Sequence, residues 1–160
     1  MPLAVQAKDM ERIRRVLSDL LSRSESDECF LSDSGGYLVA QEGDSRADAS
    51  LLSALAAGVF LASRELARML GENEFNTVFH QGENKNIFIR AVTTELLLVV
   101  IFSSNGNLGL VKLYSTPAVT DLQELFAAIQ TRHDEVPTTD HRSFVLKEDA
   151  IFVAKPAPPR

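Results

Sequence analysis

The stretch that decides the fold runs from residue 48 to residue 71 and reads DASLLSALAAGVFLASRELARMLG. Alanine and leucine dominate it, and both are strong helix formers. Asp48 stands at a favourable N-cap position, and Gly71 stands where a left-handed C-cap belongs. The sequence therefore predicts a long helix over residues 48–70.

Two apolar stripes follow this predicted helix at helical spacing. The first stripe, which suits packing on a sheet, consists of Leu52, Leu55, Val59, Ala62, Leu66 and Met69. The second stripe consists of Leu51, Ala54, Gly58 and Leu61, and it runs into Glu65 and Arg68. A surface helix of a two-layer domain has one face to bury, so the second stripe predicts that something else packs there.

The segments before the long helix predict a helix and a hairpin. Apolar residues from Ile13 to Leu21 recur at helical spacing among charged ones, which predicts an amphipathic helix over residues 8–23. Residues 28–33 (ECFLSD) and 37–41 (YLVAQ) are typical of short strands. Ser34-Gly35-Gly36 between them supplies a tight turn, because glycine adopts positive φ without steric strain.

Three β-type segments and a closing helix are expected after the long helix. Residues 77–92 mix polar and apolar positions, with a candidate break at residues 82–84. Residues 95–102 are apolar on both faces, as in a central strand. Residues 108–114 alternate well enough to predict a fifth strand. Residues 122–129 then predict a closing helix, capped near Thr120 or Asp121.

Composition sets limits on class and compartment. The chain has 160 residues, 45% hydrophobic and 24% charged, which fits one globular domain plus a tail. A net charge of -6 argues against nucleic acid as the main partner. The longest apolar run, residues 54–62, is far short of the roughly 20 residues of a membrane span. The charged N-terminal segment does not match a secretory signal, so we expect a cytoplasmic protein without a membrane span.

The tail differs in character from the domain. We expect the domain to cover residues 8–131 and a Pro-containing tail to cover residues 132–160. Two short apolar segments stand in that tail, residues 144–146 (FVL) and 151–153 (IFV). A polar tail of this kind is usually disordered. Alternatively, Phe144, Ile151 and Phe152 dock in a groove or on a partner.

No catalytic, cofactor-binding or metal site emerges from the residues. Ser32-Asp33-Ser34-Gly35-Gly36 looks like the serine-nucleophile string of trypsin-like proteases, but the chain is too short for two β-barrels and no histidine is placed as a base. His80, His133 and His141 are scattered and lack the ligand spacing of zinc sites. Phosphate-cradling glycine motifs are absent from the sequence. Cys29 stands within a strand, which favours an inert buried thiol.

At this point the order helix, hairpin, long helix, three strands and helix resembles the Roadblock/LC7 domains, and among them the bacterial MglB-type regulators of small Ras-like GTPases. The residues that carry the likeness are Phe30-Leu-Ser-Asp33 with Gly36, Leu55-Ala-Ala-Gly58, Leu66-Ala67, Leu70-Gly-Glu-Asn-Glu-Phe75, Phe79-His-Gln-Gly82, Leu97-Leu-Val-Val-Ile-Phe102 and Leu108-Gly-Leu-Val-Lys-Leu113.

The resemblance implies an α/β, profilin/longin-like sandwich. Its five-stranded, largely antiparallel sheet carries the long helix on one face and the N- and C-terminal helices on the other. It also implies a homodimer that pairs one edge strand of each subunit, here Val78, Phe79, His80 and Gln81. The two long helices then form a platform for the GTPase. In this sequence the platform residues are Ala54, Gly58, Leu61, Glu65 and Arg68.

The implied function is that of a homodimeric, non-catalytic regulator of a small Ras-like GTPase, acting by GTPase activation or nucleotide exchange, in bacterial polarity or gliding motility. The chain departs from the family at Leu61, Arg64 and Glu65, where small residues are expected. The alternative is therefore a dimeric scaffold or complex subunit that no longer regulates a GTPase.

The arginines have no distinguishing context and are predicted to be solvated surface charges. They include Arg12, Arg46, Arg64, Arg68 and Arg90.

Overall fold

Eight helices and strands follow one another in the computed structural model, which describes residues 5–44 and 46–135. In chain order they are α1 (Ala7–Ser24), β1 (Glu28–Asp33), β2 (Leu38–Gly43), α2 (Ala49–Leu70), β3 (Thr77–His80), β4 (Lys85–Ala91), β5 (Leu96–Ser103) and α3 (Leu108–Glu135). The predicted first helix, hairpin and long helix are confirmed to within two residues at each end. The β-type segment 77–92 splits at residues 81–84 into β3 and β4, as its candidate break indicated.

The five strands form one antiparallel sheet in the order β2-β1-β5-β4-β3. The strand β5 lies at the centre, between β1 and β4, where Val99 is opposite both Phe30 and Ile89. Residues 96–100 of β5 are buried without interruption, because both faces of the central strand are covered. The strands β2 and β3 are the two edges of the described sheet.

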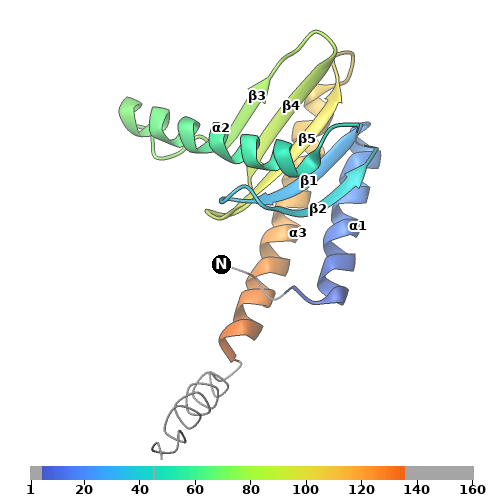
Figure 1. Ribbon diagram of the computed structural model, residues 1–160, viewed down its shortest axis with the longest axis vertical. Helices are drawn as coiled ribbons and strands as arrows, with labels where there is room; N and C mark the ends of the chain where they lie inside the picture. Colours follow the sequence, from blue (N-terminus) through green and yellow to red (C-terminus); the bar gives the residue numbers. More distant parts are fainter. Residues whose placement is uncertain (1–4, 45, 136–160) are drawn as a thin grey trace, which may run out of the picture.

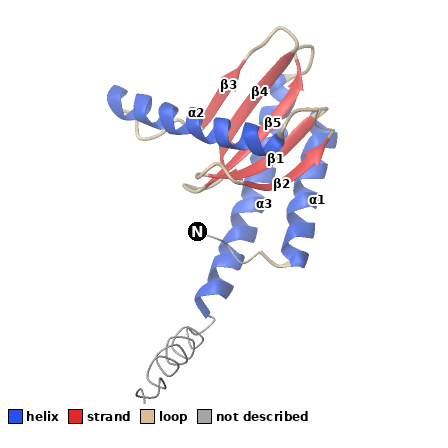
Figure 2. Ribbon diagram, in the orientation of Figure 1, coloured by secondary structure: helices blue, strands red, loops and turns tan. Residues whose placement is uncertain are grey.

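Helices cover both faces of the sheet, with α2 on one face and α1 and α3 on the other (Figures 1 and 2). Alternate strand residues point to opposite faces. Phe30 and Val99 therefore lie in the core beneath α2, with Phe60. Leu98 and Phe88 lie in the core beneath α1 and α3. This arrangement confirms the expected α/β sandwich, with its long helix on one face and the terminal helices on the other.

The turn between β1 and β2 explains the protease-like string. The backbone N–H of Gly36 donates to the Asp33 carbonyl at 3.0 Å, and the Asp33 carboxylate accepts from the backbone N–H of Tyr37 at 2.9 Å. Gly36 has a φ of +88°, and a Cβ there would come 2.8 Å from the Cα of Ala54. Glycine is therefore required where this turn lies against α2. The string makes a hairpin turn, as predicted.

The predicted strand over residues 108–114 is wrong. These residues form the first two turns of α3, which continues without a break to Glu135. The Asn107 side chain caps this helix by accepting from the backbone N–H of Gly109 at 2.8 Å. The closing helix predicted from Thr120 or Asp121 is thus the second half of a much longer one. Pro117 stands inside this helix, at a position where proline is usually unfavourable.

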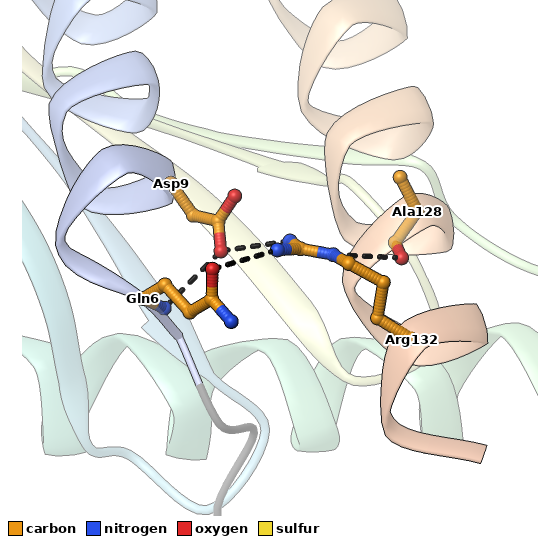
Figure 3. Close-up of polar contacts among 4 residues, drawn as sticks. All are labelled: Gln6, Asp9, Ala128 and Arg132. Carbon is orange, nitrogen blue, oxygen red and sulfur yellow. Dashed lines mark hydrogen bonds and ion pairs between the residues drawn. The ribbon is translucent and has the colours of Figure 1, made fainter. Parts of the chain in front are cut away.

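The end of α3 is tied to the start of α1. The Arg132 guanidinium donates to the Asp9 carboxylate at 2.8 Å and to the Gln6 side-chain oxygen at 3.0 Å (Figure 3). The guanidinium also reaches the Ala128 carbonyl at 3.5 Å. Asp9 is buried, and the hydrogen bond from Arg132 lowers the pKa of its carboxyl group. Packed structure therefore extends past the expected domain end at residue 131, at least to Arg132.

Candidate partner-binding surface

The face of α2 that lies on the sheet is made of small residues around one phenylalanine. Its buried residues are Ala49, Ser53, Ala56, Ala57, Phe60, Ser63 and Ala67. Most of the first apolar stripe was therefore assigned to the wrong face, although Leu52 and Val59 are half-buried against the core beneath α2. Leu55, Leu66 and Met69 are 59%, 57% and 74% exposed. The small side chains let the helix backbone approach the strands closely, whereas large ones there would hold it away from the sheet.

Both ends of α2 are fixed as the sequence predicted. The Asp48 carboxylate accepts hydrogen bonds from the backbone N–H groups of Ser50 at 3.0 Å and Leu51 at 3.2 Å. Gly71 closes the helix with a φ of +75° in the left-handed region. These caps define the length of helix that is available to a partner.

The second stripe of α2 does face away from the sheet. Leu51 and Leu61 are more than half exposed, and Ala54 and Gly58 between them are exposed as well. A Cβ built at Gly58 would meet nothing within 4 Å. A glycine inside a helix is less favourable than alanine by about 1 kcal/mol. Nothing within the described chain explains glycine at this position.

Exposed apolar side chains are concentrated on α2. Among the described residues, the large hydrophobic side chains that are exposed number nine, and six of them belong to this helix: Leu51, Leu55, Leu61, Leu66, Met69 and Leu70. The C-terminal end of α2 also extends past the sheet edge formed by β3 (Figures 1 and 2). Concentrated exposed apolar surface on a folded domain marks an interaction site.

The charged end of the stripe is internally paired. The Arg68 guanidinium donates to both carboxylate oxygens of Glu65, and its Nε lies 3.0 and 3.1 Å from them. This hydrogen bonding lowers the pKa of the Glu65 carboxyl group. Because both side chains are exposed, the pair stabilises the helix only weakly. A partner at this end of α2 meets an ion pair beside the exposed Leu61.

Arg90 is not the solvated surface charge that the sequence suggested. It is half-buried on β4, and its Nη1 donates to the hydroxyl groups of Ser115 at 3.0 Å and Thr116 at 2.9 Å. It joins the sheet to α3. Its partners Ser115 and Thr116 on α3 could not be found from the sequence, because they follow residues 108–114, which were expected to form a strand.

The edge strand β3 forms the sheet edge past which the C-terminal end of α2 extends (Figure 1). In the described sheet β3 pairs with β4 alone. The side chain of Val78 is half-buried under α2, and Phe79 is stacked on Phe102 with ring centroids 6.2 Å apart. His80 is exposed at the end of the strand, and Gln81 is exposed just beyond it. The structure thus brings β3 and the apolar end of α2 to one side of the molecule.

By length and apolar composition, α2 is also the one helix of residues 5–44 and 46–135 that could cross a membrane. This is weak evidence for a span, because the packed helix of a soluble domain passes the same test. The face of α2 that carries Phe60 lies on the sheet. Arg64, Glu65 and Arg68 interrupt the exposed faces.

The residues considered for chemistry lie apart in the structure. Cys29 is buried, its thiol donates to the Leu17 carbonyl at 3.3 Å, and burial raises its pKa to about 12. The thiol is buried, as predicted, and its raised pKa disfavours the reactive thiolate. Within the described residues, no three His, Cys, Asp or Glu side chains gather to hold a metal ion. Phe144, Ile151 and Phe152 lie outside the described residues.

Comparison with known proteins gives consistent relatives. The sequence profile of the Roadblock/LC7 domain matches residues 12–102. The structure resembles MglB of Myxococcus xanthus, with 33% identity, a TM-score of 0.70, and coverage of 73% of this chain and 96% of that one. It also resembles the gliding protein MglB of Thermus thermophilus, with 29% identity, a TM-score of 0.70, and coverage of 77% and 94%. An MglB in a tetrameric arrangement is 27% identical with a TM-score of 0.75, over 79% of this chain and 96% of that one.

Proposed function

Because the chain belongs to the Roadblock/LC7 domain family, we propose that it is a homodimeric, non-catalytic regulator whose α2 helices bind a small Ras-like GTPase. The resemblance to MglB proteins supports a regulatory role. We place the protein in the cytoplasm, in a polarity or gliding-motility system.

The observation that carries this proposal is Gly58. It stands in the middle of a long helix, on the face turned away from the sheet, with open space where a side chain would be. Its neighbours on that face are exposed alanine and leucine side chains. Within the subunit, nothing requires position 58 to lack a side chain. A glycine there would instead let the backbone of a partner approach the helix closely.

The exposed apolar residues support a dimer as well as a platform. In the proposed dimer, the β3 edges of two subunits pair and extend the sheet. The overhanging ends of α2, with Leu66, Met69 and Leu70, are then covered by the second subunit. The outward stripe around Gly58 stays open for the GTPase. One helix thereby serves two contacts, which accounts for apolar residues on more than its sheet-facing side.

A specific observation favours the alternative of a scaffold without GTPase regulation. Leu61 and the Glu65–Arg68 ion pair occupy the outward face where the family is expected to have small residues. Overpacking a close interface costs roughly 1–3 kcal/mol per site, enough to lose tenfold or more in affinity. A partner shaped for small residues would therefore bind this surface poorly.

GTP hydrolysis by the small Ras-like GTPase of the same organism, measured with and without this protein, distinguishes the GTPase regulator from the scaffold. We expect stimulation of about tenfold or more, which corresponds to about 1.4 kcal/mol of barrier lowering. No stimulation of hydrolysis or of nucleotide exchange, together with no complex on a sizing column, would favour the scaffold.

Two variants test whether stimulation of GTP hydrolysis depends on the outward face of α2. Gly58→Arg places a long charged side chain on the platform, at an exposed site with room for it, and is expected to abolish stimulation while the far-ultraviolet circular dichroism is unchanged. Thr120→Arg, at an exposed position of α3 on the other face of the sheet, is the matched control and should retain full stimulation. Equal activity of both variants would contradict the platform assignment.

A further inference from the structure

We infer that the apolar segment Phe144-Val-Leu146 of the same chain docks in a cavity between the C-terminal half of α3 and the β4–β5 turn. The cavity has a volume of about 380 Å³. It lies away from α2 and β3, the elements of the proposed GTPase and dimer contacts, so it stands independently of them.

The cavity has an apolar floor and a polar rim. Leu96, Phe126 and Ala127 contribute the apolar lining, and Gln123 and Gln130 border it from α3. The Gln123 amide is already engaged, because its Nε2 donates to the Val92 carbonyl at 2.7 Å. The cavity can therefore accept one or two apolar side chains, and its volume is at the low end of typical ligand cavities.

The charges at the rim select among the possible segments. Glu95 of the turn and Asp134 of α3 both line the cavity and are exposed. The sequence around the docking segment is Arg142-Ser-Phe-Val-Leu-Lys147, so a cation stands on each side of the apolar residues. The second apolar segment, residues 151–153, instead has Glu148 and Asp149 before it and Lys155 after it, so its flanks carry a net negative charge, which an acidic rim repels. Charge therefore favours the 144–146 segment over the 151–153 segment.

The path of the chain places the segment within reach. His133 and Asp134, in the last turn of α3, line the cavity themselves. The clamp between Arg132 and Asp9 fixes this end of α3 against α1 (Figure 3). Phe144 stands nine positions after Glu135, and nine residues span at most about 30 Å. The segment can therefore turn back onto the cavity beside which the helix ends.

A local contact of this kind needs little intrinsic affinity. An effective concentration on the order of 1 mM for a short linker, against a Kd on the order of 0.1 mM for the contact, gives about ten docked molecules for each undocked one. The docked segment would cover Ala127, whose side chain is otherwise exposed at the cavity.

The test measures how fast a thiol reagent labels Ala127→Cys in the full chain. The native Cys29 does not interfere, because it is buried and its pKa is raised to about 12. We expect the additional change Phe144→Glu to speed labelling about tenfold. The matched change Ile151→Glu should leave the rate unchanged. Equal rates with and without Phe144→Glu would overturn the proposal, as would an equal acceleration by Ile151→Glu.

A second measurement establishes that the docking is within one chain. A short bismaleimide should join Ala127→Cys to Val145→Cys in the double variant and give a cross-linked single chain. When the two single variants are mixed instead, no cross-linked pair of chains is expected. Cross-linking only in the mixture would assign the cavity to another copy's segment and overturn docking within the chain.

Discussion

Gly58 can be tested without a partner, because its substitution should affect the free protein and the complex in opposite directions. Alanine fits the open space at this position and is favoured over glycine in a helix by about 0.8–1 kcal/mol. We expect Gly58→Ala to raise the free energy of unfolding in urea by about that amount, while weakening GTPase binding in calorimetry. Ala62→Gly, also exposed on α2, is the converse control and should lower stability. A destabilising Gly58→Ala would mean that Gly58 packs within the protein itself.

Asp9 gives a prediction about pH. Hydrogen bonding from Arg132 lowers the pKa of Asp9 in the folded protein, so the contribution of this contact is fully present above the unfolded pKa of about 4. That contribution is lost as the pH falls through the lower, folded pKa. We expect the wild-type protein to lose more stability between about pH 5 and about pH 2 than Asp9→Asn does, measured by urea unfolding. Asp19→Asn, in an exposed pair with Arg23, should behave like the wild type.

At the scale of whole elements, α3 contains Pro117 in its interior, where proline destabilises a helix. A proline inside a helix removes one backbone hydrogen bond and destabilises the helix by roughly 3 kcal/mol. Pro117 is exposed, so alanine can replace it without opening a buried space. We expect Pro117→Ala to raise the free energy of unfolding by about 1–3 kcal/mol, against about 0.5 kcal/mol for Thr120→Ala. A less stable Pro117→Ala would show that the ring contributes to packing beside Tyr114, which lines the same groove.

The elements also show which features of the sequence could be interpreted and which could not. Asp48 and Gly71 predicted α2 because caps are local signals. Its sheet-facing side was assigned wrongly at most positions, because large apolar residues were expected to be buried, whereas close packing on the sheet selects Ala56 and Ala57. Residues 108–114 fit a strand and a helix equally well. Only their packing against α1 and the sheet, with Val111 fully buried, decides for the helix.

For the whole molecule, the two faces of the sheet are used differently. The face under α1 and α3 carries the larger core, and the Arg132 clamp joins the two ends of the domain there. The face under α2 carries the smaller core and leaves the exposed apolar residues of the helix uncovered. The resemblance suggested the proposed platform and the proposed dimer edge, whereas the extension of α2 beyond β3 is visible only in the fold (Figure 1). Leu66 and Leu70 become interface candidates only when the sheet edge is seen to end before them.

The proposed dimer makes a prediction about the backbone of β3. The Asn76 carbonyl accepts from the backbone N–H of Ala91 at 3.0 Å, so by antiparallel alternation the N–H and C=O groups of Thr77 and Phe79 point away from β4, to the open edge. Thr77→Pro removes one of these outward donors at the first residue of an edge strand, where proline is tolerated within the subunit. We expect a folded monomer in light scattering. Thr77→Val keeps the N–H donor and should remain a dimer. If Thr77→Pro were still dimeric, β3 would not be the pairing edge. The exposed apolar end of α2 would then have to be buried by helix–helix contacts between the subunits alone.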